Sequence, residues 1–179
     1  MDGYSGPLSP QGKEDYIDPL IDLLRQQGCD AAVVEDLADY GRELWAALEG
    51  TPAGFVHGDA HTGNTALHNG KFALMDFDRA AFAHPVLDVG ALADGTDFNR
   101  FDKDALARTE QVFDALYAGY SQERTLTRGE IRAVFDSVAI RHYDLIIAGV
   151  RDQGHPLSPA LVAEQHDWLM RWRELCLRR

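Results

Sequence analysis

Polar side chains of kinds that can bind metal ions crowd one short stretch in the first half of the chain. The stretch, residues 55–80, reads FVHGDAHTGNTALHNGKFALMDFDRA and sets these groups between short apolar runs. Carboxylate and amide oxygens are hard ligands, and such ligands suit Mg²⁺. The oxygen- and nitrogen-bearing side chains that could form a site here are His57, Asp59, His61, Asn64, Asp76 and Asp78.

The pattern around these residues predicts a strand, a polar loop and a hairpin. Residues 55–56 begin an apolar run that ends in the loop, and residues 65–78 read as two short strands around Asn69-Gly70, a strong hairpin signal. An antiparallel hairpin returns the chain to its start, so Asp76 is expected beside the loop that holds Asp59 and Asn64. Three oxygen-bearing side chains would then converge in a set that suits Mg²⁺ together with substrate phosphates.

The rest of the chain is predicted to be mainly helical, which gives an α+β domain dominated by helix. Residues 1–12 are rich in Gly, Pro and Ser and are expected to form a linker or extended arm. The domain itself is expected over residues 13–179, with a small hairpin that carries the polar loop. Helices are predicted over residues 13–28, 31–48, 86–93, 103–120, 127–149 and 159–178.

Length and charge limit the classes of function. The 179 residues suffice for one domain with a real core, and the net charge of −12 disfavours binding to nucleic acid or to an anionic membrane surface. An acidic surface would suit a cationic ligand or a divalent metal, or it is simply a solvated surface. Cys29 and Cys176 lie far apart and form neither a CxxC pair nor a metal-ligand spacing, so we interpret them as free thiols in a reducing compartment. The N-terminus does not resemble a signal peptide, and no apolar run is long enough to cross a membrane. These features favour a cytoplasmic protein.

The spacing of the polar residues resembles a known catalytic core. The pattern His57-x-Asp59-x-x-x-x-Asn64, followed by MDFD at residues 75–78, is similar to the aminoglycoside phosphotransferase and choline kinase family, which has a protein-kinase-like fold. The sequence HPVLDVG at residues 84–90 also fits that family. The resemblance implies ATP-dependent transfer of a phosphoryl group to a hydroxyl of an aminoglycoside-, amino-alcohol- or sugar-like substrate.

The resemblance also implies a role for each matching residue. Asp59 would be the catalytic base, and Asn64 and Asp76 would hold the Mg²⁺ that accompanies ATP. Asp78 stands where protein kinases carry the glycine of their DFG motif, and it either touches the metal or only holds the loop. Asp88 would support the loop through backbone hydrogen bonds.

The two histidines of the loop and the acidic residues that follow it have less specific roles. His57 is predicted to orient the loop, whereas His61 either contacts the cofactor phosphate or substrate or pins the loop. The acidic group 94–104 lies where this family often builds its acceptor pocket, which would favour a cationic substrate. A solvated loop and an Asp-rich helix N-terminus also explain the same residues, and this interpretation is favoured. The acidic group consists of Asp94, Asp97, Asp102 and Asp104, of which Asp94 and Asp97 are the candidate substrate residues.

The chain resembles only the C-terminal lobe of such a kinase, with the N-terminal lobe absent. The N-terminal lobe supplies a phosphate-covering loop and a strand lysine, but the chain has only Lys13, Lys71 and Lys103, none of them in such a strand before the loop. We therefore expect ATP to bind weakly. We also expect an apolar cleft face that a second copy or an N-lobe-supplying partner covers.

Two other functions remain open. One is a non-catalytic or partner-complemented pseudokinase-like binding module, which the missing N-lobe favours and the intact set of Asp59, Asn64 and Asp76 disfavours. The other is a metal-dependent phosphoesterase, because GDAHTGN at residues 58–64 is faintly similar to pieces of two-metal phosphatases. The chain has no GNH motif, which such enzymes would add.

Overall fold

The computed structural model describes residues 8–153 and 157–179 and has the mainly helical α+β fold that the sequence predicts. The helices are α1 (Lys13–Tyr16), α2 (Asp18–Gln26), α3 (Ala31–Glu49), α4 (Val86–Ala93), α5 (Ala105–Tyr120), α6 (Arg128–Gln153) and α7 (Pro159–Leu177). The strands are β1 (Gly54–Val56), β2 (Thr65–His68), β3 (Lys71–Leu74) and β4 (Ala81–Ala83), and a short 3₁₀ helix η1 covers Thr62–Asn64.

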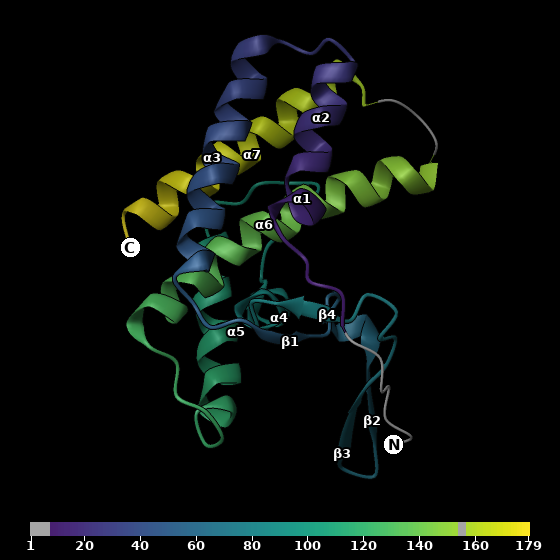
Figure 1. Ribbon diagram of the computed structural model, residues 1–179. Coiled ribbons are helices and arrows are strands. Elements are labelled where there is room, and N and C mark those ends of the chain that lie inside the picture. Colours follow the sequence, from purple (N-terminus) through teal and green to yellow (C-terminus); the bar gives the residue numbers. More distant parts are fainter. Residues whose placement is uncertain (1–7, 154–156) are drawn as a thin grey trace.

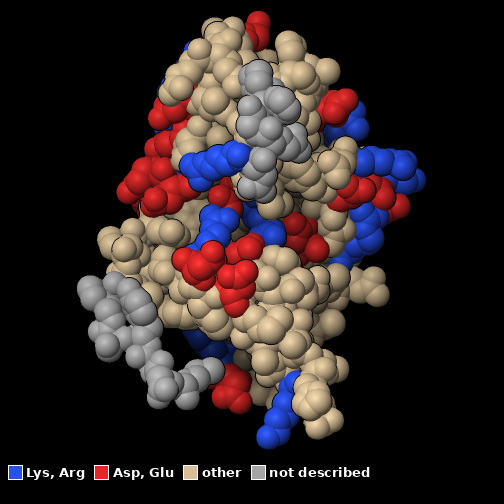
Figure 2. All heavy atoms as spheres, turned by 90° about the vertical axis from the view of Figure 1, so that its right-hand side faces the viewer, with Lys and Arg blue, Asp and Glu red and all other residues tan. Residues whose placement is uncertain are grey.

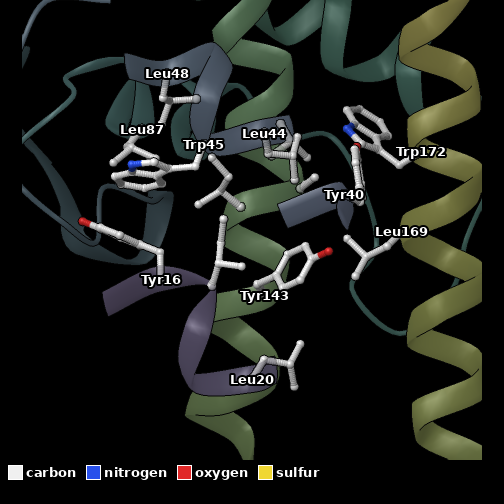
Figure 3. Packing of buried hydrophobic residues seen from close by; sticks show 14 of the residues in the cluster. Tyr16, Leu20, Tyr40, Leu44, Trp45, Leu48, Leu87, Tyr143, Leu169 and Trp172 are labelled. Atoms are coloured by element: carbon white, nitrogen blue, oxygen red, sulfur yellow. The ribbon is translucent and has the colours of Figure 1, made fainter. Parts of the chain in front are cut away.

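Helix α6 runs through the middle of the helical part and contacts α1, α2, α3, α4 and α7 (Figure 1). Its Tyr143 is fully buried and donates a hydrogen bond of 2.8 Å from its hydroxyl to the carbonyl oxygen of Leu37 on α3. Trp172 of α7 donates in the same way to Phe135 O of α6, at 3.2 Å. Both aromatic rings thus fill the core while their polar atoms stay satisfied (Figure 3). Trp45 is also buried.

The first predicted helix is divided in the structure. The sequence predicts one helix over residues 13–28, but α1 ends at Tyr16 and α2 begins at Asp18, with Ile17 between them at φ −113°. Pro19 accounts for the break, because it has no N–H to donate to the preceding turn and restricts the residue before it. Proline in the first turn of α2 is then well placed.

The four strands form two separate antiparallel ladders. β1 pairs with β4, with Val56 opposite Ala81, and β2 pairs with β3, with Thr65 opposite Leu74. Because the chain runs β1, β2, β3, β4, the two ladders are the two ends of one long hairpin that is interrupted in its middle. The sequence reasoning did not predict β4. In Figure 1 the β2–β3 end projects away from the helices, at the lower right.

The arm before α1 is extended and lies along β4. The backbone N–H of Phe82 donates to Ser9 O, and that of Gln11 donates to Phe82 O, both at 3.0 Å. Residues 1–7 of the predicted linker lie outside the described residues. None of the helices in the described part of the chain is both long enough and apolar enough to cross a membrane.

Candidate functional site

The interruption of the long hairpin creates the candidate site. Two segments leave the ladders there: the loop 57–64 between β1 and β2, and the return segment 75–80 between β3 and β4. The N–H of Met75 still donates to Asn64 O at 2.9 Å, so the two segments begin side by side. The turn between β2 and β3 has Asn69 at φ 50° and Gly70 at φ 72°, as a tight Asn-Gly hairpin turn requires. This turn is what returns Asp76 to the level of Asn64.

Helix α4 holds the start of the loop through Asp88. Its carboxylate accepts hydrogen bonds from His57 N at 2.6 Å and from Gly58 N at 3.1 Å, which are the backbone contacts that the resemblance implies. Burial raises the pKa of Asp88 above its ordinary value, and the two N–H donors offset part of that shift. Gly58 has φ +81°, and a Cβ there would lie 2.2 Å from Arg79 O, so the return segment packs directly on its backbone.

His57 joins the loop to the return segment from inside. Its ring is 2% exposed, its Nδ1 accepts from Asp59 N at 3.3 Å, and its Nε2 donates to Met75 O at 2.9 Å. The ring centre also lies 4.4 Å from that of Phe77. Both ring nitrogens are occupied by the backbone, so these contacts orient the loop and leave His57 no free nitrogen for chemistry.

The Asp59 carboxylate has partners on both of its oxygens. Asn64 Nδ2 donates to Asp59 O at 3.0 Å and to Asp59 Oδ2 at 3.2 Å, and Arg141 Nη1 of α6 lies 3.3 Å from Oδ1. His61 Nε2 lies 3.5 Å from Oδ2. Nδ1 of His61 accepts a hydrogen bond from Gly63 N at 3.0 Å, so its ring also pins the loop.

The candidate metal ligands are compatible with Mg²⁺. The amide nitrogen of Asn64 is used by Asp59, which leaves its Oδ1 for a cation. Asp76 is exposed and has φ 63°, a left-handed conformation that Asp tolerates and that clusters at functional sites. Asp78 is exposed in the same segment. Among the described residues, no group of three His, Cys, Asp or Glu side chains could hold a metal alone; Mg²⁺ usually takes one or two protein groups and completes its shell with phosphates and water.

Two contacts from α6 were missed by the sequence reasoning. Arg79, directly after Asp78, forms a bidentate ion pair with Asp144, at 2.8 and 3.0 Å, and Arg141 pairs with Asp59. Asp144 lies 65 residues from Arg79, and Arg141 lies 82 residues from Asp59. No local pattern in the sequence marks pairs so far apart.

A pocket of about 220 Å³ adjoins the loop on the side of Arg141. Asp94 lines it, and its Oδ1 accepts a hydrogen bond from Thr96 N at 2.8 Å. His142 also lines it, and burial lowers the pKa of this imidazole to about 4, so it is neutral at pH 7. Figure 2 shows the side of the molecule from which the hairpin projects, with acidic and basic side chains close together across its middle. The walls of the pocket are formed by His61, Thr62, Ala91, Leu92, Asp94, Thr96, Phe98, Arg141, His142 and Leu145.

The other acidic candidates have structural partners instead. Asp97 does not line the pocket: its Oδ1 accepts from Asn99 N at 2.9 Å, and its carbonyl accepts from Trp168 Nε1 at 3.0 Å. Asp102, which lies just before α5, accepts a hydrogen bond from Asp104 N and forms an ion pair with Arg108 in the first turn of that helix. These contacts match the alternative of loop and helix-terminus carboxylates, and they leave Asp94 as the acidic residue of this group at the pocket.

The chain matches a known protein family. The family model described as the phosphotransferase enzyme family matches residues 5–134, more than two thirds of the 179-residue chain. The matched range contains the loop 57–64, the return segment 75–80 and Asp88, but ends before Arg141 and Asp144 on α6. No curated protein matches the chain.

Proposed function

Because this chain belongs to the phosphotransferase enzyme family, we propose that it forms the metal and acceptor side of an ATP-dependent kinase for a small hydroxyl compound. In this proposal residues 13–179 form a kinase-like C-terminal lobe. The observation that carries the proposal is the position of Asp59. Its carboxylate lies between Asn64, a candidate metal ligand, and Arg141, a wall residue of the neighbouring pocket.

The proposed reaction uses Asp59 as the base. The acceptor hydroxyl lies in the pocket and donates its proton to the Asp59 carboxylate while its oxygen forms a bond to the γ-phosphorus of ATP. The bond between that phosphorus and the bridging oxygen breaks, and its electron pair leaves with ADP. Asn64 and Asp76, with Asp78 beside them, would hold Mg²⁺, which supplies electrostatic stabilisation of the phosphate charge. His57 and Asp88 keep the loop in place.

The pocket supports a small and cationic acceptor. About 220 Å³ is less than the roughly 300–1,000 Å³ typical of pockets for drug-sized ligands. An amino-alcohol or a single sugar ring therefore fits better than a complete multi-ring aminoglycoside. Asp94 at the wall supplies a carboxylate for an ammonium group, and His142 adds no charge at neutral pH.

We propose a cytoplasmic location, where ATP would serve as co-substrate. The thiols of Cys29 and Cys176 are half-buried and unpaired, which is compatible with a reducing compartment.

A partner-complemented module is the second candidate, and exposed aromatic residues favour it. Phe55 is 54% exposed and Phe77 is 44% exposed, and their ring centres lie 6.3 Å apart at the edge of the return segment. Phe82 on β4 is 47% exposed. We propose that this surface contacts the part that binds the nucleotide, supplied by a second polypeptide segment or by another copy. Large exposed apolar groups beside a candidate site are typical of interfaces.

The test of the kinase proposal is the variant Asp59→Asn. We expect phosphate transfer from ATP to a panel of amino-alcohols and sugars to fall at least about 10²-fold, because the base is lost, while the unfolding temperature stays close to that of the wild type. Asp97→Asn is the matched control, since this carboxylate lies outside the pocket. Transfer that survives in Asp59→Asn refutes the role of Asp59. Release of free phosphate from monoesters without any acceptor supports the phosphoesterase instead.

A further inference from the structure

Two ion pairs join one face of α6 to the two halves of the site. Arg141 and Asp144 lie three residues apart on α6, so their side chains leave the helix on the same face. Arg141 reaches Asp59 of the loop at 3.3 Å, and Asp144 reaches Arg79 of the return segment at 2.8 and 3.0 Å. The helix-borne partner of each pair is well shielded, with side-chain exposures of 17% for Arg141 and 11% for Asp144.

We propose that Arg141 and Asp144 are positioning residues that set the spacing between Asp59 and the Asp76–Asp78 part of the return segment. The proposal rests on the function proposed above and adds residues beyond the range that the family model matches. Asp144 needs no contact with the reacting atoms, whereas Arg141 also lines the acceptor pocket. Each acts through its partner, one on the base and the other on the segment that carries the candidate metal ligands.

The contacts around these pairs form a closed arrangement. Asp59 follows Gly58 directly, and the backbone of Gly58 packs against Arg79 O, where a Cβ would come within 2.2 Å. The side chain of Arg79 then returns to α6 through Asp144. The loop and the return segment are therefore fixed to each other, here and through the contacts of Met75 with His57 and Asn64, and to the same helix face at two points. A shift of either segment alone must break one of these contacts.

A small cavity with both polar and apolar walls adjoins this arrangement. It has a volume of about 20 Å³, and its walls include Gly58, Asp88, Arg141 and Asp144. This volume is enough for one water molecule with several polar partners. Asp88 also holds the loop backbone, so three carboxylates (Asp59, Asp88 and Asp144) and two guanidiniums (Arg79 and Arg141) lie where the loop, the return segment, α4 and α6 meet. A network of this kind fixes positions because breaking one bond leaves its partners unsatisfied.

Asp144 gives the cleaner test, because it does not line the acceptor pocket, whereas Arg141 does. Catalysis is sensitive to small misplacements, and about 1 Å can cost roughly 10²-fold in rate. We expect Asp144→Asn to lower kcat by about 10–10²-fold with little change in the acceptor KM. Arg141→Gln should lower kcat and also change KM, and Arg141→Lys should recover part of kcat because it keeps a cation near Asp59.

The experiment combines kinetics with amide hydrogen exchange of the ligand-free protein. Asp144→Asn and Arg141→Gln should increase exchange at residues 57–61 and 76–80. The control Arg173→Gln removes an ion pair with Glu43 that joins α7 to α3 and includes no residue of the loop or the return segment, and its exchange in these two segments should equal that of the wild type. The exchange arm needs neither ATP nor acceptor, so it decides the positioning role even if no phosphate transfer is found.

Two results overturn the proposal. One is unchanged exchange in both segments for Asp144→Asn and Arg141→Gln. The other is a loss of kcat in Asp144→Asn and Arg141→Gln that is no larger than the loss in Arg173→Gln at matched unfolding temperatures. The two ion pairs would then contribute to stability only. Absence of transfer in the wild type, together with the expected exchange changes, refutes kinase activity of this chain on its own and leaves the positioning of the two segments supported.

Discussion

Gly58 shows how the path of the loop depends on a single missing side chain. Its φ of +81° is unfavourable for other residues, and a Cβ would also meet Arg79 O at 2.2 Å. We expect Gly58→Ala to destabilise the protein by about 3 kcal/mol or more, since strain and overpacking add. Urea unfolding measures the change in the free energy of unfolding.

Gly28 provides the matched control for that variant. It also has a positive φ, +67°, but a Cβ there meets nothing within 4 Å. Gly28→Ala should therefore cost only the backbone strain, about 1 kcal/mol. Equal losses for the two variants would mean that the close approach of Arg79 to Gly58 contributes nothing.

Asp136 on α6 should make stability depend on pH. Burial raises the pKa of this carboxyl from 3.8 to about 6, and Arg179 and Arg132 offset only part of the shift. The folded protein therefore binds a proton between pH 6 and 4 that the unfolded chain does not, and this contribution to stability is lost as the pH rises through 6. We expect Asp136→Asn to stabilise the protein at pH 7–8 by up to about 3 kcal/mol.

The difference between wild type and Asp136→Asn should shrink as the pH falls to about 4, because the wild-type carboxyl is then neutral too. His142 acts in the opposite sense: burial lowers its pKa to about 4, so stability is lost as the pH falls from its unfolded pKa of 6.5 toward 4. The free energy of unfolding of both the wild type and Asp136→Asn must therefore be measured by chemical denaturation at each pH. The contribution of His142 is the same in both proteins and cancels in the difference. A pH-independent difference contradicts the assignment to Asp136.

At the scale of elements, the close packing of α4 on α6 determines where Asp88 meets the loop. A Cβ on Gly90 would lie 1.8 Å from Ser137 Oγ and 2.6 Å from Val134 O, so α4 approaches α6 at this glycine. We expect Gly90→Ala to force the helices apart and to destabilise the protein by about 2–3 kcal/mol, as measured by thermal unfolding. It should also increase amide exchange at His57 and Gly58, whose N–H groups bind Asp88 on α4.

Gly119 on α5 is the control for that substitution. It lies in a helix, and a Cβ there has no neighbour within 4 Å. Gly119→Ala should stabilise the protein by about 0.5–1 kcal/mol, because alanine loses less backbone entropy on folding. A loss of stability in both variants would point to a general effect of alanine in these helices rather than to the contact with Ser137.

The elements that the sequence predicts well are those with local signals. Asn69-Gly70 specifies the hairpin, and the hairpin alone brings Asp76 back toward Asn64. β4 has only three residues, Ala81–Ala83, and carries no turn or alternation signal strong enough to predict pairing with β1. The break at Ile17 follows from Pro19, but the apolar periodicity continues across it and hides it.

The same distinction applies to the site. Asp59 and Asn64 share a loop, so their proximity follows from sequence spacing. Arg141 and Asp144 reach the site from a helix far along the chain. Arginine and aspartate on an amphipathic helix are ordinary surface residues by pattern, and only the packing of α6 against the loop turns them inward.

At the scale of the whole molecule, the three lysines that could bind ATP phosphates lie outside the loop 57–64 and the return segment 75–80. Lys13 pairs with Asp18, Lys71 is exposed on the projecting hairpin, and Lys103 is exposed just before α5. We therefore expect calorimetry with ATP and Mg²⁺ to show a Kd weaker than about 0.1 mM for this chain. Micromolar binding would contradict the expectation and would require phosphate contacts from other residues.

The projecting hairpin has one apolar face that nothing in the described chain covers. Register puts Leu67 opposite Phe72 and Thr65 opposite Leu74, so these side chains share a face, with Leu67 74% exposed and Phe72 66% exposed. A two-stranded hairpin is only marginally stable alone, and such a face favours association.

We expect the purified protein to self-associate or to bind a hydrophobic dye through this face. The double variant Leu67→Thr and Phe72→Thr keeps residues that favour strands but removes apolar surface. Because both side chains are exposed, it should reduce dye binding and the weight-average mass in sedimentation while changing the free energy of unfolding by less than about 0.5 kcal/mol. Val112→Thr on α5, another exposed apolar position, is the control and should change neither. Unchanged association in the hairpin variant would assign it to another surface, such as Phe55 and Phe82 on the β1–β4 ladder.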